Sequence, residues 1–160
     1  MAWTEAETGL RIGELIPSFS GCTLDGRTIE RRQYKGRRHL VLIFTHGVAC
    51  AGCRALLAAL ARDYGACRAE GAEVLAFVPA ETVAGADAPN VPFPVLAAPP
   101  ALYARFGALA ADGAVNPALY LADRYGEVAW RVLGDRDDGH ALLVDEVVPL
   151  VERMAMVCAL

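Results

Sequence analysis

Two cysteines three residues apart, Cys50 and Cys53, are the residues in this chain whose type and spacing most clearly predict chemistry. A thiol acts as a nucleophile only as its thiolate, and a free cysteine with a pKa near ~8.5 is mostly protonated at neutral pH. A working thiol therefore needs a neighbour that stabilises negative charge. In such a pair the first thiol attacks and the second resolves the mixed disulfide. We predict that Cys50 attacks and that Cys53 resolves.

The elements around this pair place it at the start of a helix. The continuously apolar run 40–44 predicts a strand covered on both faces. After a short loop, apolar residues recur at helical spacing until Gly71. This face consists of Cys53, Leu57, Leu60, Tyr64 and Cys67. Because unpaired N–H groups and the macrodipole at a helix N-terminus favour an anion, we expect Cys50 to be the more acidic thiol and Cys53 the less exposed one.

The rest of the chain predicts an ordered series of strands and helices. The predicted elements are a hairpin within 9–36, strands at 74–78 and 93–96, a helix through Leu102 and Phe106, an antiparallel hairpin of 118–122 with 127–133, and a last helix over about 141–157 that Pro149 kinks or delays. A strand, helix and strand with this spacing form a parallel pair with a right-handed crossover. This order is that of a thioredoxin-like α/β fold, with a central mixed sheet, helices on both faces and an N-terminal β-hairpin extension.

A zinc site is the main alternative use of two cysteines at this spacing. A closed site needs four ligands, whereas His39, His46 and His140 are scattered and no second cysteine pair exists. The sequence therefore favours redox chemistry and no bound metal, with chance spacing as a further alternative. We interpret the other three cysteines, Cys22, Cys67 and Cys158, as structural. Of these, Cys22 and Cys158 could also resolve a sulfenic acid at a distance.

Several segments resemble a known family over nearly the whole chain. They are Gly13–Phe19, Leu24–Gly26, Tyr34–Gly36, Cys53–Leu57 and Asn116–Gly126. These segments are similar to the thioredoxin-like superfamily, and within it to the branch of alkyl hydroperoxide reductases and thiol-specific antioxidants, the peroxiredoxin-like proteins. The resemblance implies one domain over residues 1–160.

Departures from the peroxiredoxin pattern bear on the activity. With the family's Pro-x-x-x-Thr-x-x-Cys motif aligned on Cys53, its Thr falls at Cys50 and its Pro at His46, and its conserved Arg falls at Pro117. The Thr and Arg polarise the peroxide in that family. We therefore predict a thiol-disulfide oxidoreductase, with a peroxiredoxin-like thiol peroxidase as the alternative and a redox-silent binding or zinc module as the further one.

Five residues are expected to support the thiols. His46 is the nearest candidate base, although a loop histidine at this place is also consistent with simple solvation. By resemblance to thioredoxin-like proteins, Asn116-Pro117 should be a cis peptide facing the thiols, so that Asn116 borders a substrate groove with Ala51 and Gly52. Physics alone gives only about 5 to 6% cis for such bonds.

Composition limits the partners. The 160 residues carry a net charge of -4 and 55% hydrophobic residues, which fits a globular chain and does not suit nucleic-acid binding. No apolar run approaches the ~18 residues that span a bilayer, so we expect no membrane partner and a cytoplasmic location. The expected partners are a disulfide-containing protein or small thiol, alternatively a hydroperoxide, and a thioredoxin- or glutathione-type reductant, without a cofactor.

Overall fold

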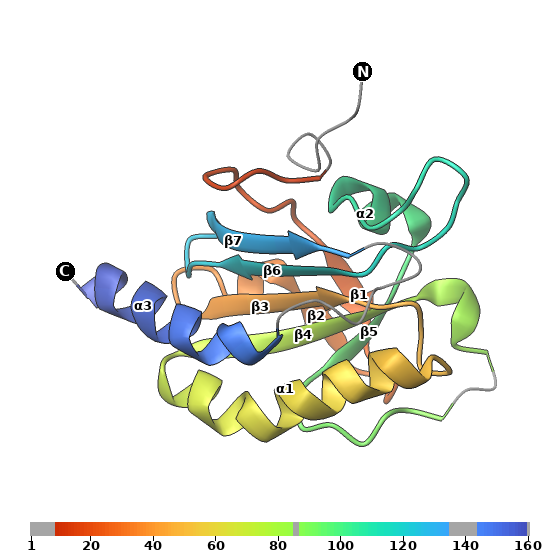
Figure 1. The fold of residues 1–160 in the computed structure, drawn as a ribbon, viewed down its shortest axis with the longest axis horizontal. Coiled ribbons are helices and arrows are strands. Elements are labelled where there is room, and N and C mark those ends of the chain that lie inside the picture. The colour runs from red at the N-terminus through yellow and green to blue at the C-terminus, as the bar shows by residue number, and fades with distance from the viewer. Residues whose placement is uncertain (1–8, 85–86, 135–143, 160) are drawn as a thin grey trace.

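The computed structural model describes residues 9–84, 87–134 and 144–159. The strands are β1 (Ser20–Cys22), β2 (Thr28–Glu30), β3 (His39–Phe44), β4 (Ala72–Pro79), β5 (Val95–Ala98), β6 (Ala118–Ala122) and β7 (Val128–Leu133). The α-helices are α1 (Ala51–Ala69), α2 (Pro100–Arg105) and α3 (Val147–Ala159), and short 3-10 helices lie at Arg31–Gln33, Ala80–Thr82 and Val144–Glu146. The main sheet has the order β5-β4-β3-β6-β7 (Figure 1). The predicted mixed sheet is thus confirmed.

The centre of the sheet is the parallel pair β3 and β4, joined by α1. All six side chains of β3 are buried, as are all eight of β4, because both strands are covered by other elements on both faces. Their register pairs His39 with Ala72 and Phe44 with Phe77. The loop that leaves the carboxyl end of β3 leads into α1, and the cysteine pair lies at the start of that helix.

The antiparallel half of the sheet is the hairpin of β6 and β7. β6 pairs with β3 so that Ala118 lies opposite Phe44. The turn between the two strands contains Gly126, whose φ of 89° lies in the left-handed region that glycine adopts without strain. The side chain of Asp123 accepts hydrogen bonds from the backbone N–H groups of Tyr125 and Glu127, which fixes this turn. The predicted antiparallel hairpin is confirmed.

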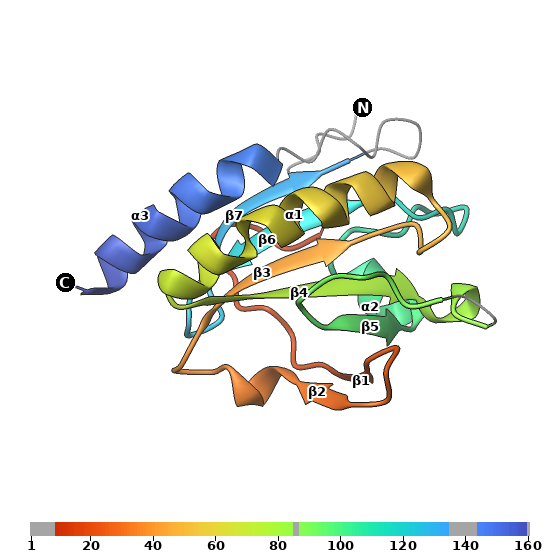
Figure 2. The same ribbon diagram turned by 90° about the horizontal axis from the view of Figure 1, so that it is seen from below.

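Helices cover both faces of the sheet, as expected. α1 and α3 lie together on one face, with Leu57 and Leu60 packed in the same core as Val151 (Figure 2). On the other face, Tyr103 and Phe106 from α2 and the segment after it pack on Phe44 and Phe77 of the central strands. The ring centroids of Phe44 and Phe77 stack at 4.5 Å. No helix in the described ranges is both long and apolar enough to cross a bilayer.

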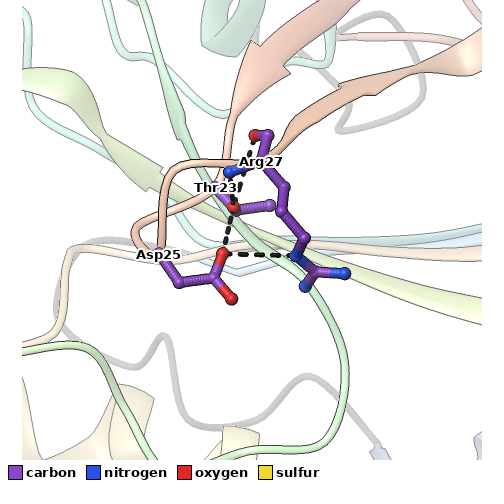
Figure 3. A network of polar contacts seen from close by, with 3 residues as sticks. All are labelled: Thr23, Asp25 and Arg27. Carbon is purple, nitrogen blue, oxygen red and sulfur yellow. Dashed lines mark hydrogen bonds and ion pairs between the residues drawn. The ribbon is translucent and has the colours of Figure 1, made fainter.

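The N-terminal hairpin of β1 and β2 is closed by a small polar network. The backbone N–H of Arg27 donates to the hydroxyl of Thr23 at 2.8 Å, and the Arg27 side chain donates to the carboxylate of Asp25 at 3.3 Å. The Thr23 hydroxyl also donates to Asp25 (Figure 3). These bonds bring the ends of the turn together. β1 and β2 pair antiparallel on either side of it, so the predicted N-terminal hairpin is confirmed.

Several strand ends differ from the sequence prediction by one or two residues, and the starts of β5 and α3 have a physical cause in proline. β5 begins at Val95 rather than at residue 93, because Pro94 has no N–H to donate and only its carbonyl joins the sheet, accepting from the N–H of Ala76. α3 begins at Val147, so Pro149 falls in the first turn, where a missing N–H costs no helical hydrogen bond. The predicted start of this helix at 141–143 lies outside the described residues.

Candidate dithiol site

Cys50 is the N-cap residue of α1. Its backbone is extended, with φ -75° and ψ 119°, and its Sγ accepts a hydrogen bond from the backbone N–H of Cys53. The N–S distance is 3.4 Å. The side chain of Cys50 is half-buried, so this sulfur lies at the positive end of the helix macrodipole and still reaches solvent.

The acidity of Cys50 follows from these contacts. Partial burial by itself raises the pKa of Cys50, but hydrogen bonds from the backbone and thiol of Cys53 and from the backbone of Gly52, together with the charge of Arg54, outweigh it. The net pKa of Cys50 is lower than the ordinary thiol value. The thiolate of Cys50 is therefore stabilised.

Cys53 has the opposite environment one helical turn further on. Its side chain is fully buried, and this burial, with the neighbouring Cys50, raises the pKa of Cys53 to about 11 in spite of a hydrogen bond from the backbone N–H of His46. That N–H lies 3.3 Å from the Cys53 sulfur. The pair thus contains one half-buried thiol of lowered pKa and one buried thiol of raised pKa.

His46 lies against both thiols. Its Nδ1 is 3.8 Å from the sulfur of Cys50 and 3.6 Å from that of Cys53. The three ligand-type atoms all lie within 4.8 Å of one another. The side chain of His46 is half-buried, so its ring is a constituent of the site and not a fully solvated group.

Buried hydrogen bonds fix the point at which the His46 loop leaves β3. The hydroxyl of Tyr103 donates to the carbonyls of Thr45 and Phe77, at 2.9 and 3.0 Å. The hydroxyl of Thr45 donates to the same Phe77 carbonyl at 2.8 Å. Because Thr45 directly precedes His46, this network sets the position from which the imidazole reaches the sulfurs.

Gly47 makes the turn after His46. Its φ of 134° is rarely adopted by residues with a side chain, and a Cβ at this position would approach the hydroxyl oxygen of Thr82 to 3.0 Å. The loop therefore passes close to the 3-10 helix that follows β4. The positive φ and the close approach to Thr82 both favour glycine beside the site.

The expected cis peptide at Asn116-Pro117 is wrong. The described residues contain no cis peptide bond, so this bond is trans. The backbone N–H of Asn116 donates to the carbonyl of Ala108 at 2.8 Å, and the carbonyl of Pro117 accepts from Gly134 at 2.7 Å. These bonds direct the segment into β6 with the isomer that X-Pro bonds intrinsically prefer.

The remaining predicted site residues have the following places. Ala51 is exposed and Gly52 half-buried in the first turn of α1, next to the thiols. Asn116 is half-buried. Pro117 comes one residue before Ala118, the partner of Phe44, and so lies at the sheet edge where β3 ends. The thioredoxin-like strand order holds although the isomer of Pro117 does not.

Sequence reasoning missed Arg54. Its guanidinium donates to the carbonyls of Val48 and Ala49, both at 3.3 Å. These residues and Asp87 border a groove of about 370 Å³. The signal was a cationic residue directly after the second cysteine, on the exposed side of the first helical turn. The guanidinium of Arg54 places positive charge beside the thiol of Cys50.

The other described cysteines lie in unlike environments. Cys22 is an exposed residue of β1, and Cys67 is fully buried in α1. Burial raises the pKa of Cys67 to about 11, with a smaller contribution from Asp63. The backbone of Cys158 lies in α3, but its side chain lies outside the described residues. Cys67 thus has the environment of a small core residue.

The sequence matches the model of one protein family. The match to the AhpC/TSA family extends over residues 12–131, well over half of the chain. The chain belongs to the AhpC/TSA family. Membership in this family indicates a thiol oxidoreductase of the peroxiredoxin-like kind. No curated protein sequence matches the chain.

Two solved structures share the fold of this chain. AhpC of Mycobacterium tuberculosis is 20% identical with a TM-score of 0.75, and the match covers 91% of this chain and 93% of that one. The reduced 2-Cys peroxiredoxin of Plasmodium vivax is 17% identical with a TM-score of 0.74, covering 92% and 83%. These structures support the peroxiredoxin-like arrangement of sheet, helices and N-terminal hairpin.

Proposed function

We propose that this AhpC/TSA protein is a dithiol peroxidase in which Cys50 reduces a hydroperoxide and Cys53 resolves the product. The observation that carries the proposal is the contrast between the two thiols. Cys50 is accessible with a lowered pKa, and Cys53 is buried with a pKa of about 11. A thiolate at the first position and a protonated thiol at the second are the states that this sequence of steps needs.

The reaction has three balanced steps. The thiolate of Cys50 attacks the terminal peroxide oxygen, an S–O bond forms, the O–O bond breaks, and the alkoxide leaves with a proton as an alcohol. The sulfur of Cys53 then attacks the sulfenic acid of Cys50, which forms the disulfide and releases water. Two thiols of a thioredoxin- or glutathione-type reductant reduce the disulfide and become oxidised themselves.

His46 is the residue proposed to move protons in these steps. Its Nδ1 lies 3.8 Å from the sulfur of Cys50 and 3.6 Å from that of Cys53. A single imidazole at this place serves both the proton that the alkoxide needs and the proton that Cys53 loses. Arg54 adds a cation that favours the Cys50 thiolate.

This proposal ranks peroxidase activity above thiol-disulfide exchange, whereas the sequence prediction put exchange first. One reason for that order was a thioredoxin-type Pro117, and its peptide bond is trans. Membership in the AhpC/TSA family also favours a peroxidase. Because the family's Thr and Arg are absent, we expect a modest catalytic efficiency with hydroperoxide, about 10⁴ M⁻¹s⁻¹ or lower.

Thiol-disulfide exchange remains the second candidate. It is favoured by the same N-cap sulfur, since a resolving thiol one turn away serves a mixed disulfide as well as a sulfenic acid. Disulfide-containing proteins or small thiols would then be the partners. The groove beside Arg54, lined also by Val48 and Pro89, is a surface on which such a partner could dock.

One experiment separates these candidates. The protein is reduced anaerobically and freed of reductant, and equal samples receive an alkyl hydroperoxide or an oxidised protein disulfide. Stopped-flow kinetics and thiol counts follow each reaction. The proposal expects the hydroperoxide to oxidise two thiols per chain and to yield the Cys50–Cys53 disulfide by peptide mapping. If thiols were lost only with the disulfide substrate, the protein would be a thiol-disulfide exchange enzyme and not a peroxidase.

Two variants locate the chemistry. Cys50→Ser should abolish hydroperoxide-dependent oxidation, whereas Cys53→Ser should still consume one equivalent and trap a sulfenic acid detectable with dimedone. Cys22→Ser is the matched control, because Cys22 is exposed on β1 and does not belong to the cysteine pair. Sulfenic acid on Cys53 in the Cys50→Ser chain would reverse the assigned roles.

A further inference from the structure

Three side-chain atoms of the site have the chemistry of zinc ligands. They are Nδ1 of His46 and the sulfurs of Cys50 and Cys53, all within 4.8 Å of one another. Imidazole nitrogen and thiolate sulfur are the donors that Zn²⁺ prefers in proteins. Within residues 9–84, 87–134 and 144–159 this is the one cluster of three or more histidine, cysteine or acidic side chains with such spacing.

The two nitrogen–sulfur separations match the corresponding edge of a zinc tetrahedron. With Zn–S near ~2.3 Å and Zn–N near ~2.05 Å, tetrahedral angles place sulfur and nitrogen about 3.6 Å apart. The Nδ1 of His46 lies 3.6 Å from the sulfur of Cys53 and 3.8 Å from that of Cys50. The two sulfurs lie within 4.8 Å of each other, and an ion at this place needs them about 3.8 Å apart.

Backbone groups already support the sulfurs as ligands. The N–H of His46 donates to the sulfur of Cys53, and the N–H of Cys53 donates to that of Cys50, at 3.3 and 3.4 Å. Such donors orient thiolate ligands and offset their charge, as outer-shell groups do at metal sites. The sequence argument against zinc counted His46 among three scattered histidines, whereas the loop after β3 places its ring beside both cysteines.

We propose that the reduced site binds one Zn²⁺ ion through His46, Cys50 and Cys53, with the fourth position open to water or an exogenous ligand. Binding releases the two thiol protons and leaves the oxidation state of both sulfurs unchanged. Oxidation to the disulfide removes two electrons and both negative charges from the pair of thiolates, and a neutral disulfide sulfur is a poor ligand for Zn²⁺, so zinc binds only the reduced chain. Zinc occupancy and thiol turnover are then mutually exclusive at these atoms.

Zinc itself is the probe in the test. The chain is reduced anaerobically, dialysed against chelator and titrated with Zn²⁺ in competition with a chromophoric chelator, and the bound metal is counted by mass spectrometry. We expect one Zn²⁺ per reduced chain and none after the thiols are oxidised with diamide. Retention of zinc by the oxidised chain, or no binding by the reduced one, would overturn the proposal.

Variants identify the ligands. His46→Ala should weaken binding by at least about tenfold, since loss of a supporting group alone costs 10- to 100-fold, and Cys50→Ser should weaken it further. Cys22→Ser is the matched control and should bind as the parent does. Unchanged affinity in His46→Ala, or loss in Cys22→Ser, contradicts the assignment. Circular dichroism shows whether each variant is folded.

The zinc proposal and the proposed peroxidase are tested separately. The peroxidase measurement follows thiol oxidation in metal-free protein, and the zinc titration uses no hydroperoxide. A chain that reduces hydroperoxide but binds no zinc overturns the metal site alone. In a chain that binds zinc, addition of one equivalent should suppress hydroperoxide-dependent thiol oxidation, and chelator should restore it. Unchanged oxidation at full zinc occupancy would refute the mutual exclusion.

Discussion

Alkylation of the reduced chain tests the inequality of Cys50 and Cys53 directly. The perturbation is a short pulse of iodoacetamide at pH 7, which modifies thiolates in proportion to their population and accessibility. Cys50 caps α1 and reaches solvent, whereas Cys53 is buried in the same helix. We expect the reagent to modify Cys50 first.

The size of the difference follows from the two pKa values. With a pKa of about 11 for Cys53, only about one Cys53 in ten thousand is a thiolate at pH 7. The pKa of Cys50 lies below 9.0, so more than about one in a hundred is ionised. The thiolate population of Cys50 is thus at least about 100 times that of Cys53. The advantage in rate is roughly tenfold smaller than this ratio, because the Cys50 thiolate is less basic and therefore less nucleophilic. Cys50 should therefore react at least about tenfold faster, before burial slows Cys53 further.

Mass-spectrometric mapping of the pulsed chain measures the two rates within one molecule. Exposed Cys22 confirms in every sample that reagent was present, and the Cys50→Ser chain shows whether Cys53 stays slow when its neighbour is gone. Modification of Cys53 or of buried Cys67 as fast as Cys50 would refute the reasoning from helix capping and burial.

Three further predictions concern the surroundings of the thiols. Tyr103→Phe leaves the buried Thr45 carbonyl without its hydroxyl donor and should lower the free energy of unfolding in urea by about 1–3 kcal/mol, whereas exposed Tyr125→Phe should change it by less than about 0.5 kcal/mol. Equal losses of unfolding free energy in the two variants would show that the Tyr103 hydrogen bond does not stabilise the fold. Pro117→Ala should cost only about 0.4–1 kcal/mol through the unfolded chain and change turnover by less than about twofold; a large loss of turnover in a stable chain would restore a thioredoxin-type role to this proline. The rate of Cys50 with hydroperoxide should fall as pH falls through its lowered pKa, with a midpoint below 9.0, and a stopped-flow profile with a higher midpoint would contradict the stabilised thiolate.

Sequence patterns identified the elements that carry the cysteine pair because those patterns are local. An unbroken apolar run predicts a strand covered on both faces, and β3 is buried along its whole length. The spacing from Cys53 to Cys67 predicts a helix face, and both ends of that face are buried. The N-cap position of Cys50 followed from the same two patterns.

The features that sequence reasoning got wrong or left open depend on distant contacts. Whether an X-Pro bond is cis is decided by its surroundings, and the partners of Asn116 and Pro117 are Ala108 and Gly134, which lie elsewhere in the chain. The position of His46 depends on the Tyr103 hydroxyl, 58 residues away from Thr45. Spacing alone does not contain these contacts, so the sequence named His46 as a candidate base but did not predict that its ring lies within reach of both sulfurs.

The location of both thiols on one helical turn has a consequence for concentration. Cys50 and Cys53 belong to the same rigid element, so the effective concentration of one sulfur around the other is set by the helix and not by the amount of protein. Formation of the disulfide between Cys50 and Cys53 is therefore a first-order step. Dilution to nanomolar levels should leave its half-time unchanged, whereas a resolving thiol on a second molecule would become slower in proportion to the dilution.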